Sequence, residues 1–280
     1  MKENTQTIAQ TFVAPERLTE VFRHIYYMKH PSEAARQQLQ LFPHYEMMLV
    51  FNFGPSLSVS VADDTSLVER VAVLGPLDRV LTYELLPDAE VMVVVFTLNG
   101  FYRLLGKPIH TLRTETENQV AVPLTEPTYL DLWENLAQLP SIADRAELLM
   151  TYIQVHVAPE DTAALLNEVS LFANLAIDPV KTIAKNRHLS PRSVQLRLQT
   201  IVGFSAKEMA RFIRFKNVIA QLVKEHPTLP DWADLVVLHG YHDQPHLIRD
   251  FQRYLGLSPT DFVKQLAEQP ICITQPGKHY

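Results

Sequence analysis

Side chains that could carry recognition chemistry are concentrated between positions 178 and 262, most densely just after Ser190. Three apolar residues there recur at helical spacing and are expected to face inward: Val194, Leu198 and Ile201. The opposite side of that helix then carries basic and amide side chains: Arg192, Gln195 and Gln199, with Arg197 near its edge. Arginine pairs with guanine, and amides pair with adenine, in the major groove of duplex DNA. The spacing therefore predicts a rigid helix face that could read base pairs.

Two sequence signals position this helix. Asp178-Pro179 opens a shorter helix that ends near residues 187–189, and Ser190-Pro191 opens the next one. Serine caps the free amides of a helix start, and proline suits the first helical turn. A short helix, a tight turn and a second helix with a polar outer face are typical of a helix-turn-helix.

The pattern recurs 53 residues further along the chain. This shift aligns Ser190 with Asp243, and the apolar positions of the first copy fall on Leu247 and Phe251 of the second. The second copy carries three basic or imidazole side chains that are available outward: His246, Arg249 and Arg253. Between the copies, Ser205 to Glu208 is an S-x-x-E capping box. It opens a long helix that can hold the two units at a fixed separation.

The stretch from Leu165 to Phe262 resembles the paired helix-turn-helix domain of the AraC/XylS family of bacterial transcription regulators. The matching strings are IAKNRHLSPRSVQLRLQTIVGFSAKE, RFIRF in the linker helix, and GYHDQPHLIRDFQRYLGLSPTDF. Three residues depart from the family pattern. His188 stands where the first turn usually has Gly, and Val236 stands where the second unit usually has Ala. Leu196 occupies an outward position where such proteins often carry Arg.

The resemblance implies a sequence-specific DNA-binding transcription regulator. By family position, the base-reading candidates are Arg192, Ser193, Gln195 and Arg197 in the first unit and Gln244, His246 and Arg249 in the second. Candidate phosphate contacts are Lys181, Lys185, Lys207 and Arg253, which would position the protein without specifying sequence. Gln199 belongs to the same outward face as Arg192. Arg214 is expected to support the fold.

Charge is distributed unevenly along the chain. The net charge of the 280 residues is −6, but residues 181–216 contain nine basic residues and one acid, a local net of +8. The local field governs contact with phosphate. The single cysteine, Cys272, excludes an intramolecular disulfide. The polar start has no signal segment, and the longest apolar run, Val91–Phe96, is too short for a bilayer. These features favour a soluble cytoplasmic protein with no membrane association.

The N-terminal half has a different pattern. Residues 15–28 place Leu18, Phe22 and Ile25 at helical spacing, which predicts a helix. From Tyr45 onward there are five short β-rich runs, separated by turn signals at Gly54-Pro55, Asp63-Asp64, Gly75-Pro76 and Pro87-Asp88. Strands at about this spacing predict a small antiparallel β barrel or sandwich, which matches the sensor domain that the resemblance implies.

Helices are predicted at residues 99–106, 127–139, 141–157 and 161–176. The chain is therefore expected to be α+β, with an N-terminal antiparallel β barrel or sandwich with helices and a C-terminal all-α double helix-turn-helix domain. We expect a sensor and dimerisation domain at residues 1–158, the DNA-binding domain at 159–266 and a tail at 267–280. The apolar stripe of the 141–157 helix predicts a homodimer through residues 128–157, or packing on the chain's own β domain: Ile142, Ala146, Leu149, Ile153 and Val157.

Two rival functions stay open at this point. A metal-dependent, cupin-like β-barrel enzyme with a DNA-binding tail would need two or three histidines and a carboxylate on facing strands. The histidines of the first half are scattered and form no H-x-H pair: His24, His30, His44 and His110. We therefore predict no catalytic residue, no metal and no cofactor. The other rival is a regulator whose β domain binds a partner protein instead of a small-molecule effector. RNA polymerase is a further possible partner. The ligand-binding residues are not assigned.

Overall fold

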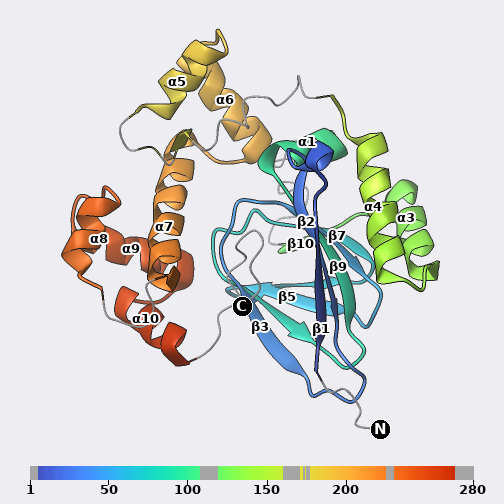
Figure 1. Cartoon of the computed structure of the whole chain (residues 1–280). Coiled ribbons are helices and arrows are strands. Elements are labelled where there is room, and N and C mark those ends of the chain that lie inside the picture. The colour runs from blue at the N-terminus through green and yellow to red at the C-terminus, as the bar shows by residue number, and fades with distance from the viewer. Residues whose placement is uncertain are drawn as a thin grey trace. The chain divides into compact units, whose positions relative to one another are not determined.

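The computed structural model describes residues 6–107, 119–159, 171–172, 174, 177–224 and 230–268 (Figure 1). The chain divides into two compact units, which are described one at a time. The N-terminal unit holds the described residues up to Pro159 and is rich in β-strands. The C-terminal unit holds the described residues from Leu171 onward and is helical.

The N-terminal unit is built from two antiparallel sheets. The six-stranded sheet has the order β1 (Ile8–Val13), β2 (Phe22–Lys29), β9 (Glu90–Phe96), β4 (Met48–Asn52), β7 (Val71–Leu74) and β10 (Ala121–Pro123). The four-stranded sheet has the order β3 (Gln37–Leu41), β8 (Leu81–Leu85), β5 (Leu57–Val61) and β6 (Asp64–Val68). The two sheets are not closed into a barrel. Of the two predicted architectures, a two-sheet arrangement is therefore the one observed.

One apolar core joins the two sheets. Its members come from alternate positions of strands in both sheets, among them Met48 and Val50 of β4, Leu57 and Val59 of β5, and Leu81 of β8. Side chains on a strand point alternately to its two faces, so β9 can contribute Val91 and Val95 to this core while Met92 and Val94 are buried on the other face. The six-stranded sheet is therefore covered on both sides.

The predicted helix at residues 15–28 is wrong. Only Glu16–Leu18 forms a short 3-10 turn (η1), and Phe22–Lys29 forms strand β2 in the middle of the sheet. The run is rich in aromatic and β-branched residues, which favour strands. A register shift between Phe22 and His24 lets both Phe22 and Ile25 be fully buried. Because of this bulge, two buried residues of the strand lie three positions apart, which is also a helical spacing.

The other predicted helices of this unit are confirmed. They are α1 (Leu98–Leu105), α3 (Pro127–Gln138) and α4 (Ile142–His156). Gly106 ends α1 with φ +66°, a left-handed conformation that glycine adopts without steric cost. In α4, Ala146, Leu149 and Ile153 are buried within the chain itself. The stripe proposed for dimerisation thus packs against its own unit, which was the alternative prediction.

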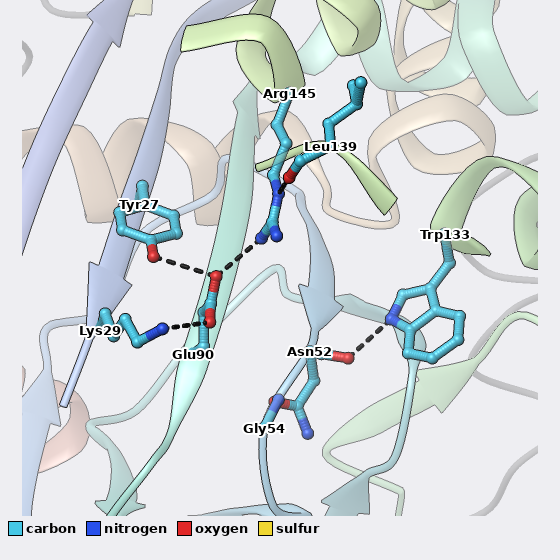
Figure 2. A network of polar contacts seen from close by, with 8 residues as sticks. All are labelled: Tyr27, Lys29, Asn52, Gly54, Glu90, Trp133, Leu139 and Arg145. Atoms are coloured by element: carbon cyan, nitrogen blue, oxygen red, sulfur yellow. Dashed lines mark hydrogen bonds and ion pairs between the residues drawn. The ribbon is translucent and has the colours of Figure 1, made fainter. Parts of the chain in front are cut away.

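A polar network around Glu90 ties α4 to the six-stranded sheet (Figure 2). The Glu90 carboxylate accepts hydrogen bonds from the Tyr27 hydroxyl at 3.0 Å, the Lys29 ammonium at 3.0 Å and the Arg145 guanidinium at 2.7 Å. Arg145 also donates its Nε hydrogen to the Leu139 carbonyl at 2.8 Å. Burial acts to raise the pKa of Glu90, but the bonds from Lys29 and Tyr27 and the charges of Lys29 and Arg145 outweigh it, so the pKa lies below the ordinary value.

A second contact fixes α3 on the same side of the sheet. The Trp133 indole donates a hydrogen bond of 2.6 Å to the Asn52 carbonyl at the end of β4 (Figure 2). The Trp133 ring also stacks on Phe53, and the Arg70 guanidinium lies 5.2 Å from the centre of the Trp133 ring. These contacts attach both helices to strand ends, so α3, α4 and the sheet form one packed body.

The C-terminal unit contains α5 (Pro179–Asn186), α6 (Pro191–Val202), α7 (Ala206–Lys224), α8 (Trp232–Leu238), α9 (Gln244–Leu255) and α10 (Pro259–Glu268). Two short helix pairs, α5–α6 and α8–α9, are joined by the long α7, which packs against both α6 and α9 (Figure 1). The predicted helix at residues 161–176 lies almost entirely outside the described residues, and so do Cys272 and most of the tail from residue 267.

Candidate nucleic-acid interface

The first helix pair has the predicted boundaries and caps. The Asp178 side chain accepts from the amide of Lys181 at the start of α5, and the Ser190 hydroxyl accepts from the amide of Ser193 at the start of α6. Pro179 and Pro191 occupy the first helical positions. Side-chain caps satisfy backbone donors that the helix itself leaves free. The local sequence therefore sets both helix starts.

The predicted inner face of α6 is confirmed, and it determines the outer face. The buried residues are Val194, Leu198, Ile201 and Val202. Besides Pro191 in the first turn, the exposed residues are Arg192, Gln195, Leu196, Arg197 and Gln199. Gln199 also donates a 3.3 Å hydrogen bond to the Gly203 carbonyl at the end of its own helix. The exposed face is thus basic and amide-rich, with one leucine in it.

The turn between α5 and α6 contains a strained residue. His188 has φ +52°, in the left-handed region, and the amide of Leu189 bonds the Ala184 carbonyl at 2.8 Å. At the matching point of the second turn, Gly240 has φ +64° and the amide of Tyr241 bonds the Val236 carbonyl at 2.9 Å. His188 therefore adopts the conformation that the family pattern assigns to glycine.

The second helix pair repeats the frame with a longer turn. The side chain of Asp243 caps α9 by accepting from the amide of His246 at 2.8 Å. His242 separates this cap from Tyr241, whereas Ser190 directly follows Leu189 in the first turn. The predicted inward residues Leu247 and Phe251 are fully buried. Besides Pro245, the exposed side chains near the start of α9 are Gln244, Ile248 and Arg249.

Two predicted base-reading residues have local contacts. The Ser193 hydroxyl lies 2.9 Å from the Ser190 hydroxyl in the cap of α6. His246 is half-buried, and its ring meets the Tyr241 ring edge-on at 5.2 Å between centres. These contacts occupy part of each side chain, so Arg192, Gln195 and Arg249 present more of their polar atoms to solvent.

The predicted phosphate contacts are all exposed. They are Lys181, Lys185, Lys207 and Arg253. Lys181 forms an exposed ion pair of 3.4 Å with Asp178 on its own helix. The Arg253 guanidinium lies 5.7 Å from the centre of the Tyr254 ring. Exposed ion pairs contribute little energy, so the Lys181 ammonium can exchange Asp178 for an external anion.

The linker helix α7 begins with the predicted capping box. The Glu208 carboxylate accepts from the Ser205 amide at 2.9 Å, and the Ser205 hydroxyl accepts from the Glu208 amide at 3.2 Å. The hydrogen bond from the Ser205 backbone lowers the pKa of Glu208 against the opposing effect of burial. The reciprocal pair of hydrogen bonds fixes the point at which the chain leaves the first helix pair, α5–α6, and enters α7.

A buried polar network, which was not predicted from the sequence, joins α7 to the second unit. Asp250 of α9 is fully buried. Its carboxylate accepts from Arg211 of α7 at 2.5 Å and from the Tyr241 hydroxyl at 3.0 Å. Arg214 of α7 lies over the Tyr241 ring at 5.3 Å. A buried carboxylate requires charged or hydrogen-bonding partners, and here α7 and the turn before α9 supply them.

This network corrects the interpretation of the basic run at Arg211, whereas a fold-supporting role for Arg214 is already expected from the sequence. Two of the nine basic residues of the run, Arg211 and Arg214, are engaged in the contacts around Asp250 and Tyr241. The basic residues left at the surface of the first helix pair are Lys181, Lys185, Arg187, Arg192 and Arg197. The sequence did contain a signal for the network. Asp250 lies on the apolar stripe of Leu247, Phe251 and Tyr254, where an acid needs a partner.

The described residues contain no group of three or more His, Cys, Asp or Glu side chains that could hold a metal ion. A helical membrane span needs about 20 apolar residues, and no helix among the residues described here is long and apolar enough.

A family model matches the segment that contains these helices. The model, described as "Helix-turn-helix domain", covers residues 183–265, which include α6, α7, α8 and α9 in full. The chain thus carries an AraC-type helix-turn-helix domain over these residues. It is therefore a DNA-binding transcription regulator. Residues 10–118 match a second model, "Domain of unknown function (DUF6597)", which assigns the N-terminal unit no function.

No curated protein matches the regulator significantly. Among solved structures, it is similar to ToxT from Vibrio cholerae, with 10% identity over 92% of this chain and 97% of that chain and a TM-score of 0.40. It is also similar to the AraC-like transcriptional activator CuxR, with 10% identity over 94% and 85% and a TM-score of 0.29. A DNA-binding transcriptional dual regulator from Escherichia coli K-12 shares 18% identity over 40% and 96%, with a TM-score of 0.32. At these TM-scores the likenesses are weak and transfer no residue roles.

Proposed function

We propose that this regulator recognises one specific duplex sequence with both helix-turn-helix units at once. The observation that carries the proposal is the pair of capped helices, α6 and α9, whose apolar sides are buried and whose exposed sides carry arginine and amide groups. In the first unit Arg192, Gln195 and Arg197 would read bases, with Ser193 and Gln199 at the edge of the contact. In the second unit Gln244, His246 and Arg249 would do so.

Phosphate contacts would come from residues that surround these faces. Lys181, Lys185 and Lys207 are exposed around the first unit, and Arg253 is exposed on α9. They would hold the protein on the duplex without selecting its sequence. The long α7 would set the distance between the two contacts, because it packs against both α6 and α9.

The direct test is a footprint of the full-length protein on the DNA upstream of its own gene. We expect one protected segment, and an affinity that falls steeply as salt rises, because each phosphate contact releases bound counterions. The affinity for an unrelated duplex of equal length, measured by fluorescence anisotropy at the same salt, is the control. Equal affinity for both duplexes would refute sequence-specific recognition, and the absence of any salt-dependent binding would refute DNA binding by this face.

We further propose that the N-terminal unit controls the regulator by binding a small apolar effector. The core shared by the two sheets is apolar, and several side chains packed against it are only partly buried: Tyr26, Leu39, Leu41, Val61 and Tyr83. An interior of this kind suits an apolar ligand better than a charged one. A partner protein on the outside of the unit is the alternative occupant.

Thermal unfolding and operator affinity, measured together against a panel of apolar and charged small molecules, test this control. An effector should raise the unfolding temperature of the N-terminal unit, with a shift that grows as the logarithm of its concentration above Kd, and should change the operator affinity. If one of the partly buried residues is enlarged, as in Val61→Phe, the temperature shift should shrink while DNA binding without effector stays unchanged. An effector that acts equally on the Val61→Phe variant binds elsewhere.

We propose, finally, that two copies pair through helices α3 and α4. Because the inward stripe of α4 is buried, pairing would use the opposite side of the helix, where Leu148, Tyr152 and Val155 recur at helical spacing. Val155 is 71% exposed. Val155→Glu should then give a folded monomer with weaker operator binding, and Gln154→Glu, an exposed neighbour, should remain dimeric. Sedimentation of a wild-type monomer at micromolar concentration would exclude the dimer.

A further inference from the structure

Leu196 occupies the centre of the outward face of α6. Its side chain is 66% exposed, although the other aliphatic residues near it on this helix are buried. At about 100° per residue, Leu196 points away from Val194, Leu198 and Ile201, and Arg192 lies one turn before it on the same side. Single exposed leucines are common on protein surfaces. The position is what sets this one apart, because it lies within the proposed base-reading face.

The second unit repeats this combination in the reverse order. Under the shift of 53 residues, Gln195 and Leu196 fall on Ile248 and Arg249. Ile248 is 37% exposed, and Arg249 is exposed beside it. Each recognition helix therefore presents one polar and one aliphatic side chain at the same two adjacent outward positions. Solubility does not favour an exposed aliphatic side chain, so the presence of Leu196 in α6 and Ile248 in α9 calls for another explanation.

The charges around Leu196 indicate what covers it. Helix α6 contains no acidic residue, and Arg192 and Arg197 are exposed on the same helix. A polyanionic partner that carries an apolar group between its charges would match this arrangement. In the major groove of duplex DNA, the C5-methyl group of thymine is the apolar feature of the base-pair edges, and aliphatic side chains contact it.

We propose that Leu196 and Ile248 each recognise the methyl group of a thymine beside the base that the neighbouring polar residue reads. This inference rests on the proposed DNA recognition and specifies part of its sequence content. The operator should contain one thymine that Leu196 contacts in the half bound by α6. It should contain another that Ile248 contacts in the half bound by α9. An adenine contact of Gln195 and a guanine contact of Arg249 would lie next to them.

The experiment separates the methyl group from the rest of the base. Duplexes that the full-length protein prefers are first selected from a random pool, and each thymine of the best one is then replaced singly by deoxyuridine, which lacks only the methyl. We expect the affinity of the wild-type protein to fall about fourfold at one position in each half, the effect of one buried methyl-sized group. The other replacements should leave the affinity unchanged.

Variants assign each methyl group to its residue. Leu196→Ala should bind the thymine duplex more weakly and should lose its sensitivity to deoxyuridine at the first position only, whereas Ile248→Ala should lose it at the second. Leu238→Ala, which shortens another exposed leucine (61% exposed) outside the proposed reading faces, is the matched control and should keep both sensitivities. Because Leu196 is exposed, its replacement by alanine should leave the unfolding temperature unchanged.

The outcomes distinguish this inference from the function on which it rests. If no duplex is preferred, sequence-specific recognition itself is refuted. If a duplex is preferred but the wild-type affinity ignores every deoxyuridine, the methyl readout is wrong and Leu196 serves another contact, such as one with a protein. The same conclusion follows if Leu196→Ala keeps the full sensitivity of the wild type at both positions.

Discussion

The two helix-turn-helix units share one frame but differ in charge and in how they are held. Residues 178–203 contain five basic residues and one acid, a net of +4, whereas residues 231–256 contain two basic residues and four acids, a net of −2. The first unit is therefore suited to attract phosphate through its surface. The second has less surface charge to offer, and it is fixed to α7 by a buried acid.

One pair of aligned positions shows how the same frame takes different roles. Arg197 of α6 and Asp250 of α9 are related by the shift of 53 residues. Arg197 is exposed, whereas Asp250 is fully buried and bonded to Arg211 and Tyr241. The packing of α7 against each unit thus decides whether this position faces solvent or the interior. A repeat in sequence predicts a shared backbone, and neighbouring helices decide what each side chain does.

The largest expected effect comes from neutralising the buried carboxylate of Asp250. Asp250→Asn should destabilise the C-terminal unit by about 2–3 kcal/mol, because it removes the charge of a fully buried carboxylate that accepts hydrogen bonds from Arg211 and Tyr241. Trp232 at the start of α8 reports on this unit, so its fluorescence during urea unfolding, in a Trp133→Phe background, measures the change.

The aligned substitution in the first unit is the matched control. Arg197→Gln alters an exposed side chain and should change the free energy of unfolding by less than about 0.5 kcal/mol. If both variants unfold at the same urea concentration, the ion pair contributes no more than a surface contact and the contrast between the units fails.

The next effect distinguishes base recognition from phosphate attraction within the first helix-turn-helix unit. Arg192→Ala should cost about 1–3 kcal/mol of binding free energy on the best duplex and relax the preference at one base pair. Lys185→Ala should weaken the binding of all duplexes alike, because a phosphate contact carries no sequence information. Anisotropy titrations of both variants against singly mutated duplexes measure this. A uniform loss for Arg192→Ala would place Arg192 on the backbone of the DNA.

Much of the C-terminal unit could be predicted because its signals are local. Caps such as Ser190 and the Ser205–Glu208 box act within a few residues of each other, and both form as predicted. The period of Val194 and Leu198 likewise follows from one helix alone. The contact of Asp250 with Arg211 spans 39 residues, so no local pattern could specify it. The base-reading residues remain predictions, because only the presence of DNA can test them.

The N-terminal unit was harder to predict because its order is set by distant pairing. The sequence pattern predicts a helix where strand β2 forms, because a bulge at Phe22–His24 spaces the buried residues of the strand irregularly. β9 was recognised from its apolar run, yet its neighbours in the sheet are β2 and β4, which no local signal indicates. Glu90 gave no signal either. Its partners Tyr27 and Arg145 lie 63 and 55 residues away.

A smaller effect concerns the two turns. His188→Gly should stabilise the C-terminal unit by about 0.5 kcal/mol, because it removes the cost of a left-handed backbone at an L-residue. The greater conformational freedom of glycine in the unfolded chain offsets this gain only partly. Gly240→Ala is the converse change in the second turn and should cost about 1 kcal/mol. Urea unfolding followed by Trp232 measures both. Destabilisation by His188→Gly would mean that the His188 side chain has a stabilising contact that outweighs the strain.

The smallest effect is a pH dependence that only one recognition helix should show. The Asp243 cap of α9 is ionisable, whereas the Ser190 cap of α6 is not. The hydrogen bond from the His246 amide lowers the pKa of Asp243, with further help from His242 and against a slight effect of burial. A carboxyl group whose pKa is lower in the folded protein than in the unfolded chain stabilises the fold at pH values above the unfolded pKa of 3.8. This stabilisation is lost as the pH falls through the pKa of the folded protein. Asp243→Ser should therefore flatten the loss of stability below about pH 4, and Ser190→Asp should steepen it. Unfolding of the two variants and the wild type at pH 6 and pH 3 gives the comparison, and superimposable pH profiles would show that the caps do not titrate with folding.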